Sequence, residues 1–326
     1  MPPIALIRDP SSLPAEIARP VVAIGNFDGL HRGHRAVIDK TLSLAQRLRR
    51  PSAILTFEPH PRDFFRPQAP VFRLTPLAEK TLIAGELGLD ALIVLSFDAE
   101  MAKMEAARFV EEWLVGRLNI SAVIVGTDFR FGARRAGTSQ FLAQEGALCG
   151  FEVEILPEVA TREALRVSSS AVRGALEAGN IALASELLGH RWFVTGEVLH
   201  GEKRGRSLGF PTANLRLDPS CRLRHGIYAV RVLLDGRVHE AVSSFGRRPT
   251  FDNGAPLLEV FLFDFEGDLY GRSLVVEFVD WLRGEEKFES VEALVSQMRQ
   301  DVLEAKVALA KNASGPEASI FERQIA

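Results

Sequence analysis

The sequence has few cysteines and no long apolar run, and these absences exclude several classes of protein. Its 326 residues contain two cysteines, Cys149 and Cys221, which lie far apart and fit neither a metal-binding spacing nor a disulfide framework. We expect both to be buried or half-buried residues in a reducing compartment. No apolar run approaches the roughly 18 residues of a membrane-spanning helix, and the first residues lack the pattern of a signal peptide. The sequence therefore predicts a cytoplasmic protein with no membrane partner.

An excess of positive charge is also missing. The formal net charge is −3 and the isoelectric point about 6.2, so no basic field is available to attract nucleic acid. No Walker A sequence, zinc-ligand spacing or Gly-x-Ser-x-Gly elbow occurs. With 47% apolar residues, the chain has ample material for the cores of two domains. Any phosphate chemistry should therefore be local, with small molecules as partners; the oligomeric state stays open.

A strand, a glycine-rich turn and a helix are predicted near the N-terminus. The apolar run Val21–Ile24 precedes Gly25–His34, which reads Gly-Asn-Phe-Asp-Gly-Leu-His-Arg-Gly-His, and helical spacing follows over Ala36–Leu48. This order places His31 and His34 at a helix N-terminus, where backbone N–H groups and the helix dipole favour an anion such as a polyphosphate. The alternative from the residues alone is a solvated helix cap with two incidental histidines.

Strands and helices alternate through the first 190 or so residues, which favours a parallel sheet with helices on both faces. In such a sheet, ligands bind beyond the carboxyl ends of the strands. The further predicted strands are 53–57, 91–95, 122–125 and 151–155, and the further predicted helices are Thr75–Leu87, Ala106–Leu118 and Ser139–Leu148.

Three more stretches of the first half carry residues suited to a substrate pocket. Phe57–Arg62 and Gly126–Gly132 each follow a predicted strand, and Ser168–Arg173 opens a predicted helix. Serines at that helix start can cap it, and Arg173 adds a fixed cation suited to phosphate. Taken alone, the first two could be structural turns and the third a serine-rich N-cap.

After residue 191 the pattern changes to short alternating strands separated by turns such as Asp235-Gly236. This pattern predicts antiparallel pairing into a small barrel. A final helix from Val291 to about Leu309 would cover the barrel, and the tail from Asn312 has little periodicity. The predicted strands are Phe193–Leu199, Ile227–Leu234, Val238–Phe245, Leu257–Phe263 and Leu274–Phe278.

The first strand of the second half leads into a basic glycine-rich loop, Gly201–Asn214. Such a loop can hold phosphate, and Thr212 and Asn214 offer hard oxygen ligands for Mg²⁺. Glu259 stands inside an apolar strand, so it needs a partner or a task unless it faces outward. An exposed hairpin and an outward-facing strand glutamate are the alternatives from the residues alone.

Several of these motifs resemble known families. The run Gly25–His34 resembles the ATP-binding signature of the nucleotidyltransferase superfamily, in its FAD synthetase branch, as do Thr-Phe-Glu-Pro-His-Pro at 56–61 and Val-Gly-x-Asp-Phe-x-Phe-Gly at 125–132. In the second half, Gly-Arg-x-x-Gly-Phe-Pro-Thr-Ala-Asn at 205–214 resembles the signature of bacterial riboflavin kinases. Together the two halves resemble the prokaryotic bifunctional riboflavin kinase/FAD synthetase family.

That resemblance implies an α/β fold followed by a β fold. Residues 1–188 would form a doubly wound, Rossmann-like nucleotidyltransferase domain with FMN adenylyltransferase activity, residues 189–312 a small antiparallel riboflavin kinase barrel with a terminal helix, and residues 313–326 a tail. The barrel would phosphorylate riboflavin to FMN with ATP. The first domain would then transfer AMP from a second ATP to FMN, giving FAD and pyrophosphate. Mg²⁺ is implied with ATP.

The resemblance also implies roles for individual residues. Glu259 would be the general base of the kinase, and His31 and His34 the catalytic donors of the adenylyltransferase. The implied ATP-binding residues of the adenylyltransferase are Gly25, Phe27, Asp28, His31, Gly33, His34, Ser168, Ser169 and Arg173. Its implied FMN loops contain Phe57, Pro59, His60, Asp128, Phe129 and Phe131. The implied ATP- and flavin-binding residues of the kinase are Gly201, Lys203, Gly205, Arg206, Gly209, Phe210, Pro211, Thr212, Asn214, Arg283 and Glu286, with Thr212 and Asn214 at the metal.

Some residues depart from the family pattern. Ser244 and Phe245 stand where the family commonly has Asn-Ile, and Phe261 stands where His is frequent, so no proton role is assigned to position 261. Three other functions stay open from the sequence: a flavokinase with a degenerate first half, a flavin-binding regulator without enzymatic activity, and an adenylyltransferase for another phosphorylated acceptor.

Overall fold

The computed structural model describes residues 4–157, 167–200, 208–247, 256–312 and 319. The chain divides into two compact units. Unit 1 comprises Met1–Val71 and Lys80–Val167, and unit 2 comprises Phe72–Glu79 and Ser168–Ala326. The domain boundary at residue 188 stays a prediction.

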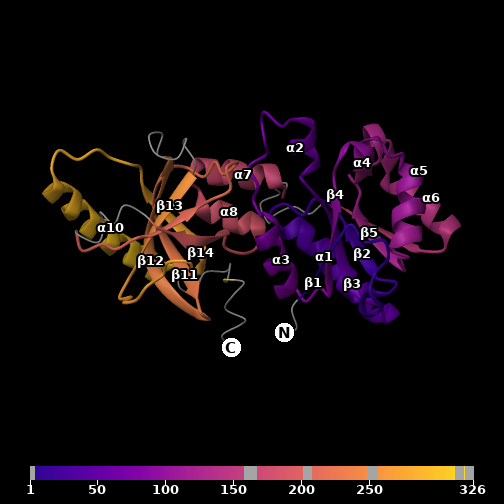
Figure 1. The fold of residues 1–326 in the computed structure, drawn as a ribbon, viewed down its shortest axis with the longest axis horizontal. Coiled ribbons are helices and arrows are strands. Elements are labelled where there is room, and N and C mark those ends of the chain that lie inside the picture. The colour runs from indigo at the N-terminus through magenta and orange to yellow at the C-terminus, as the bar shows by residue number, and fades with distance from the viewer. Residues whose placement is uncertain (1–3, 158–166, 201–207, 248–255, 313–318, 320–326) are drawn as a thin grey trace. The chain divides into compact units, whose positions relative to one another are not determined.

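A six-stranded parallel sheet forms the centre of unit 1. Its order is β1-β4-β3-β2-β5-β8, and every neighbouring pair is parallel (Figure 1). The strands are β1 (Ala5–Arg8), β2 (Val21–Ile24), β3 (Ser52–Glu58), β4 (Ala91–Ser96), β5 (Ala122–Gly126) and β8 (Glu152–Leu156). A separate hairpin pairs β6 (Arg130–Phe131) with β7 (Gly137–Thr138). The predicted doubly wound parallel sheet is confirmed.

Helices connect these strands. In chain order they are α1 (Arg32–Leu48), α2 (Pro61–Phe65), α3 (Leu77–Glu86), α4 (Ala99–Lys103), α5 (Ala106–Phe109), a π-helix (Val110–Arg117) and α6 (Ser139–Cys149), with 3-10 turns at Ala15–Ile17 and Ala133–Arg135. The helix predicted over Ala106–Leu118 is thus α-helical only in its first turn. The edge strand β1 was not predicted from the sequence. It has only four residues, which alternate between partly buried and exposed, so its hydrophobic pattern is too short to identify a strand.

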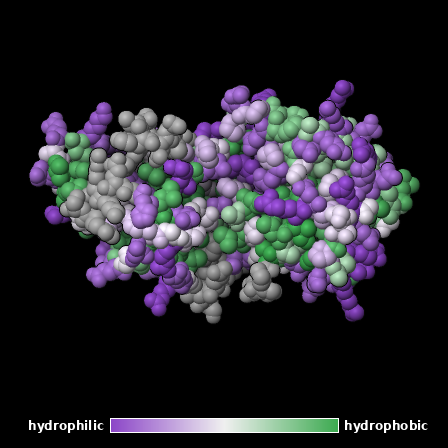
Figure 2. Space-filling view, in the orientation of Figure 1, coloured by the Kyte–Doolittle hydropathy of each residue, from purple (hydrophilic) through white to green (hydrophobic). Residues whose placement is uncertain are grey.

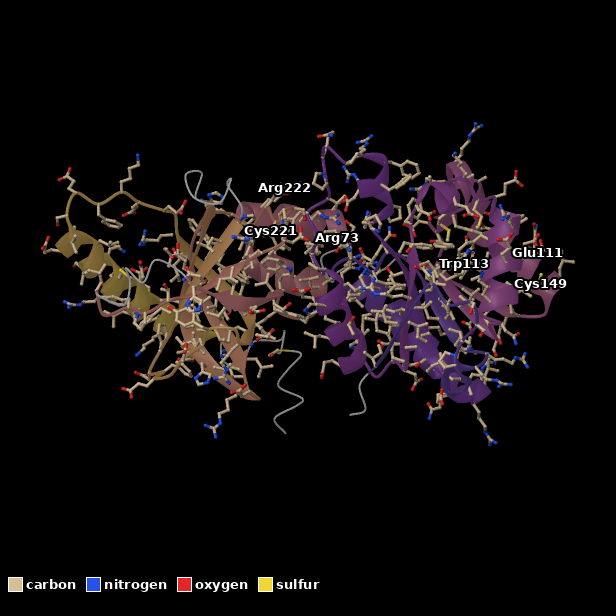
Figure 3. The ribbon with its side chains drawn as sticks, viewed as in Figure 1. Arg73, Glu111, Trp113, Cys149, Cys221 and Arg222 are labelled. Atoms are coloured by element: carbon tan, nitrogen blue, oxygen red, sulfur yellow. The ribbon has the colours of Figure 1, made fainter. Side chains whose placement is uncertain are left out.

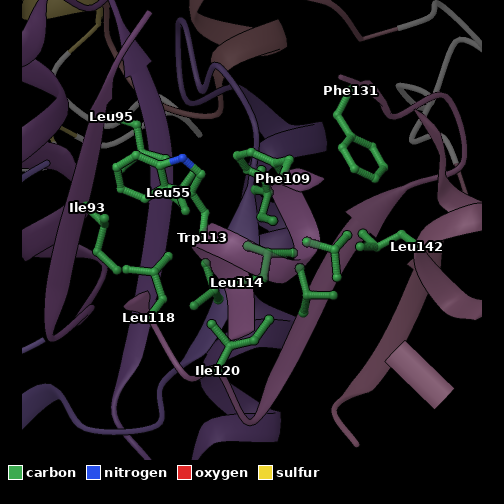
Figure 4. Packing of buried hydrophobic residues seen from close by; sticks show 14 of the residues in the cluster. Leu55, Ile93, Leu95, Phe109, Trp113, Leu114, Leu118, Ile120, Phe131 and Leu142 are labelled. Atoms are coloured by element: carbon green, nitrogen blue, oxygen red, sulfur yellow. The ribbon is translucent and has the colours of Figure 1, made fainter. Parts of the chain in front are cut away.

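The sheet of unit 1 has a core on each face. One core packs β-strand residues such as Leu55 and Ile93 against Phe109, Trp113 and Leu142 (Figure 4). The other packs Val21, Ala122 and Ile124 against Leu44 and Ala45 of α1. A strand buried on both faces has no polar side, so β2 reads as a continuous apolar run.

A closed antiparallel barrel of six strands forms the centre of unit 2, as predicted. The strands follow the order β10-β13-β12-β11-β14-β9, and β9 pairs with β10 to close the ring. They are β9 (Phe193–Leu199), β10 (Ala213–Arg216), β11 (Gly226–Leu234), β12 (Arg237–Arg247), β13 (Pro256–Leu262) and β14 (Ser273–Arg283). The predicted Asp235-Gly236 turn joins β11 to β12, and both of its residues have positive φ.

Side chains of the barrel strands alternate between its interior and its outer face. On β13, Leu258, Val260 and Leu262 are buried, whereas Glu259 and Phe261 between them are only partly buried. The terminal helix α10 (Val291–Lys311) packs on the outer face through Ala305, Ala308 and Leu309 (Figure 1). The predicted covering helix is confirmed.

Two helices and a short segment pack with the barrel in unit 2. The helices are α7 (Ser169–Ala178) and α8 (Ile181–Leu188). The segment Phe72–Glu79 contacts β9 and the residue before it: Trp192 Nε1–H donates to the Leu74 carbonyl at 2.9 Å, and Thr195 donates through its N–H and its hydroxyl to the Glu79 carboxylate. Apolar contact between Phe72 and Trp192 completes this junction.

Hydrophilic side chains interrupt the apolar ones across the visible surface of both units (Figure 2). Among the described residues, Leu148 is the most exposed large apolar side chain, at 81%. It precedes Cys149, the last residue of α6, which is exposed, so the expectation that both cysteines are at least half-buried is wrong for Cys149 (Figure 3). Cys221 is buried as expected, next to Ser220, whose hydroxyl accepts the N–H of Arg73 at 3.0 Å.

The first residue of β11 is a glycine for a steric reason that can be tested. Gly226 has a φ of 142°, and a Cβ there would lie 2.2 Å from the Arg283 carbonyl oxygen. We expect Gly226→Ala to lower the free energy of unfolding by roughly 2–5 kcal/mol, because overpacking adds to backbone strain. Gly236→Ala is the matched control, since Gly236 has a φ of 75° but open space around it. It should cost only about 1–2 kcal/mol. Equal losses in urea unfolding of the two variants would contradict the steric argument.

Candidate functional site

The predicted motifs of unit 1 gather at one edge of its sheet. Gly25–His31 follows β2, Pro59-His60 follows β3, and Thr127–Phe129 follows β5, and these three strands are neighbours in the order β3-β2-β5. From β2 the chain proceeds to β3 and β4 on one side, whereas β5 and β8 lie on the other. The carboxyl end of β2 is therefore at the topological switch point, the usual ligand site of an open parallel sheet.

His31 is the N-cap of α1. Its Nδ1 atom accepts the backbone N–H of His34 at 3.3 Å. Because Nδ1 is the acceptor, a neutral His31 ring carries its proton on Nε2. The sequence had suggested a histidine near the helix start, and the structure gives that histidine a fixed tautomer.

His34 stacks on His31. The ring centroids are 3.7 Å apart with an angle of 11° between the planes, and Phe27 lies at 5.2 Å from the His34 ring. The Nδ1 atom of His34 is enclosed and has no hydrogen-bond partner among the described residues. Burial, and then the neighbouring His31 and Lys80, hold the pKa of His34 well below its ordinary value of 6.5. His34 is therefore a neutral imidazole that stacks on the ring capping the helix N-terminus.

The turn before His31 has an unusual backbone. Phe27 and Leu30 have φ of 48° and 43°, in the left-handed region that non-glycine residues rarely adopt, and Gly29 between them has φ of 94°. Both non-glycine side chains are buried, so packing holds the turn in place. A Cβ at Gly33 would lie 3.1 Å from Cε1 of His31, so the missing side chain leaves room for this ring.

Lys80, which the sequence prediction did not single out, contacts the turn before His31. Its side chain is 1% exposed, and its Nζ donates to the Asn26 carbonyl at 2.8 Å and to Thr56 Oγ1 at 3.1 Å. Asn26 belongs to the strained turn. A signal did exist in the sequence: Lys80 precedes Ile83 and Ala84 by three and four residues, which places a charge on the buried stripe of α3.

The two predicted FMN loops contribute aromatic side chains beside the switch point. Phe57 contacts Phe97 and Phe109, and Phe109 also contacts Phe131. Phe131 is buried, and Phe129 stacks on it with centroids 5.4 Å apart. The His60 ring caps α2 after Pro59 by accepting the Arg62 N–H, and Asp128 is exposed. The sequence analysis did not predict these contacts of Phe97 and Phe109. Phe97 directly follows β4 and Phe109 ends α5, and neither segment contains a recognisable motif.

The predicted phosphate clamp lies in unit 2. Ser168 caps α7 by accepting the N–H of Ala171 at 3.2 Å, as predicted for a serine-rich N-cap, and Ser169 is the first residue of α7. Arg173 Nε–H donates to the Phe72 carbonyl at 2.8 Å. These residues belong to a different unit from His31 and His34, so their role in ATP binding stays a prediction.

Two of the predicted kinase residues, Asn214 and Glu259, lie side by side on the outer face of the barrel. Strand register pairs Asn214 with Glu259, and Glu259 with Ser244 on its other side. The row continues to Ile227 and Arg283. Paired residues of neighbouring strands point to the same face, so Asn214, Glu259 and Ser244 form one polar group. The sequence had placed Asn214 in a loop, and the structure places it in β10.

Part of the predicted kinase loop can be followed. Gly209 has a φ of 86°, and Phe210 makes an edge contact with Phe261 at 5.3 Å. Pro211 is exposed and Thr212 half-buried immediately before β10. Gly201, Lys203, Gly205 and Arg206 lie outside the described residues.

Arg283 ends β14 in an ion pair. Its Nε and Nη2 donate to the two carboxylate oxygens of Asp301 on α10 at 2.6 and 2.7 Å, and this hydrogen bonding raises the pKa of the guanidinium. The next segment passes close to β12, because a Cβ on Gly246 would clash with the carboxylate of Glu285. Glu286, a predicted binding residue, is exposed.

Two family models match the chain, one on each half. The model for FAD synthetase matches residues 13–171 and the model for riboflavin kinase matches residues 188–309. A bifunctional riboflavin kinase/FMN adenylyltransferase of Pseudomonas fluorescens is 42% identical over 309 residues, covering 94% of this chain and 99% of that protein. The chain belongs to this family. The enzyme of the same name from Escherichia coli K12 is 39% identical, covering 88% of this chain and 91% of that protein.

A solved structure has the same fold over nearly the whole chain. It is described as a macrolide-efflux protein from Streptococcus pneumoniae, with a TM-score of 0.80 and 30% identity, covering 93% of this chain and 99% of that one. Within the described residues of this riboflavin kinase/FMN adenylyltransferase family member, we find no helix with the length and apolarity of a membrane span.

The lowered pKa of His34 predicts a pH-dependent stability. In the unfolded chain His34 takes up a proton near pH 6.5, whereas the folded state resists it, so the unfolded state binds more protons below that pH. The free energy of unfolding should therefore fall as the pH drops, by up to about 1.4 kcal/mol per pH unit from this residue. In urea unfolding at about pH 7.5 and 5.5, His34→Gln should show a smaller difference between the two pH values than wild type. His239→Gln serves as control, and an unchanged difference in His34→Gln would contradict the prediction.

Proposed function

We propose that the family's two reactions are divided between the two sites described above. Unit 1 carries adenylyl transfer from ATP to FMN at the His31–His34 pair, and the outer face of the barrel carries phosphorylation of riboflavin at Glu259. The observation that supports the first assignment is the stacked pair of imidazoles at the N-terminus of α1. The second rests on the register that pairs Glu259 with Asn214.

Adenylyl transfer needs little acid–base chemistry. An oxygen of the FMN phosphate attacks the α-phosphorus of ATP, the bond to the bridging oxygen breaks, and pyrophosphate leaves. The FMN phosphate is already anionic at neutral pH, so it needs no strong base. The protein must orient the two anions and stabilise the charge that develops on the phosphoryl oxygens. A neutral His31 with its proton on Nε2 can donate to such an oxygen, and the helix N-terminus favours the same charge.

The kinase reaction needs a base. The terminal hydroxyl of riboflavin attacks the γ-phosphorus of ATP, ADP leaves, and the hydroxyl proton passes to a carboxylate, here Glu259. Asn214 and Ser244 flank Glu259 on the same face and would orient the carboxylate and the hydroxyl. Residues on rigid barrel strands hold these groups in register.

The residues of the barrel site also suit a magnesium ion. Asn214 offers an amide oxygen beside Glu259 in the strand register, and Thr212 offers a hydroxyl just before β10; Mg²⁺ prefers such hard oxygen ligands. When bound with ATP, the ion would neutralise phosphate charge. Thr212 and Asn214 would hold it beside the base.

His31 can be tested separately from its role as a helix cap. His31→Ala removes both the cap and the Nε2 donor, whereas His31→Asn keeps a side chain suited to the N-cap position. We expect both variants, and His34→Ala, to lower the turnover of FMN adenylylation by roughly 10²–10³-fold, because each loses a donor to the transition state. The measurement is the separation of riboflavin, FMN and FAD over time with ATP and Mg²⁺. Adenylylation near the wild-type rate in folded His31→Asn would show that His31 only caps the helix.

Glu259 tests the second site. Glu259→Gln keeps the shape of the side chain and removes the base, so riboflavin phosphorylation should fall by roughly 10²–10⁴-fold while added FMN is still converted to FAD. Glu240→Gln, an exposed change on the neighbouring strand β12, is the matched control and should leave both activities intact. Equal loss of both activities in Glu259→Gln would refute the assignment.

A further inference from the structure

The side chain of Lys80 is buried, although its charge strongly favours water. Its Nζ reaches the Asn26 carbonyl at 2.8 Å, Thr56 Oγ1 at 3.1 Å and Glu58 Oε1 at 3.6 Å. A buried ammonium is costly unless such partners replace water. An apolar side chain of the same length would fill the space without that cost, so the charge itself calls for an explanation at this position.

The contacts of Lys80 converge on one peptide group. The Asn26 carbonyl accepts from Lys80 and also from the Thr56 hydroxyl, at 3.1 Å. Asn26 immediately precedes Phe27, the first of the left-handed residues of the turn. Strained backbone persists only where its surroundings hold it in place. The Asn26 carbonyl, which accepts two hydrogen bonds, is held in this way at the start of the turn.

The charge of Lys80 also acts at His34. It is one of the causes that hold the pKa of His34 low, after burial and the neighbouring His31. A cation enclosed beneath an anion site is screened little by solvent, so it favours negative charge in the site above it. Lys80 therefore combines a geometric and an electrostatic effect on the same turn.

We propose that Lys80 is a positioning residue of the adenylyltransferase, whose ammonium fixes the Asn26 carbonyl and so holds the turn that presents His31 and His34 to the phosphates of ATP. This inference rests on the proposed role of the histidine pair. Glu58 balances the charge of Lys80, and Thr56 shares the carbonyl with it.

The experiment compares Lys80→Met with Lys40→Met in the full chain. Lys40 is a partly exposed lysine of α1 that pairs with Glu154 at 2.8 Å, and its variant should keep both activities. For Lys80→Met we expect the kcat of FMN adenylylation to fall about 10²-fold, as for a misplaced catalytic group, with a smaller change in the KM for ATP. Riboflavin kinase activity of the same chain should persist and reports that unit 2 is folded, and an unchanged far-UV circular dichroism spectrum reports the same for unit 1. Lys80→Arg, which keeps a cation, should recover part of the lost turnover.

Two further measurements separate a positioning role from a structural one. Thr56→Val keeps the shape of the side chain and removes the second donor to Asn26, so it should lower the same kcat in a milder way. In NMR titration, the His34 signal, assigned by its absence in His34→Gln, should titrate at higher pH in Lys80→Met because a nearby positive charge is gone.

The outcomes distinguish this inference from the function on which it rests. If His31→Asn and His34→Ala keep full adenylylation, the histidine site itself is wrong. If those variants lose activity but Lys80→Met and Thr56→Val stay within about threefold of wild type, only the role of Lys80 is overturned. An equal loss of both enzymatic activities in Lys80→Met would also overturn it, because it would show a general structural role.

Discussion

The turn between β2 and α1 is the constraint on which the proposed adenylyltransferase site depends. It must leave the most buried strand of the sheet, reverse through two left-handed non-glycine residues and start a helix within seven residues of Gly25. One hydrogen bond, from the His34 N–H to His31 Nδ1, does three things at this point. It caps the helix, sets the tautomer of His31 and brings the two rings into a stack. In the proposed site, the groups that face the phosphates are ones that helix formation itself has oriented.

In the barrel, the register of the strands decides which polar side chains lie next to one another. A strand alternates its side chains, so a carboxylate among apolar neighbours faces outward, and only pairing decides which residues stand beside it. Shifting β10 by one residue against β13 would replace Asn214 beside Glu259 by a residue of the barrel interior. The closed ring fixes that register from both sides, and Arg283 with Asp301 attaches the end of β14 to α10. The polar row is thus a consequence of barrel closure.

The chain belongs to a family in which one chain carries two nucleotide-dependent reactions. The two proposed sites differ in the elements of secondary structure that hold their side chains. In unit 1 the groups come from a helix terminus and strand ends, with a buried lysine beneath them. In unit 2 they come from the faces of strands. The segment Phe72–Glu79 packs with the barrel, where Leu74 and Glu79 accept from Trp192 and Thr195. Unit 2 therefore includes residues from the first part of the sequence.

The sequence by itself determined several local features. They are the buried run before Gly25, the histidines at a helix start, the Asp235-Gly236 hairpin and the glutamate within an apolar strand. These are local signals, because periodicity and turn residues act over a few positions. Only the tertiary structure decided that Asn214 pairs with Glu259, that Phe109 joins Phe57 to Phe131, and that Lys80 reaches Asn26 from 54 residues away. Such contacts depend on register and packing between distant segments, so the sequence could place Lys80 on the buried stripe of α3 but could not identify its partner.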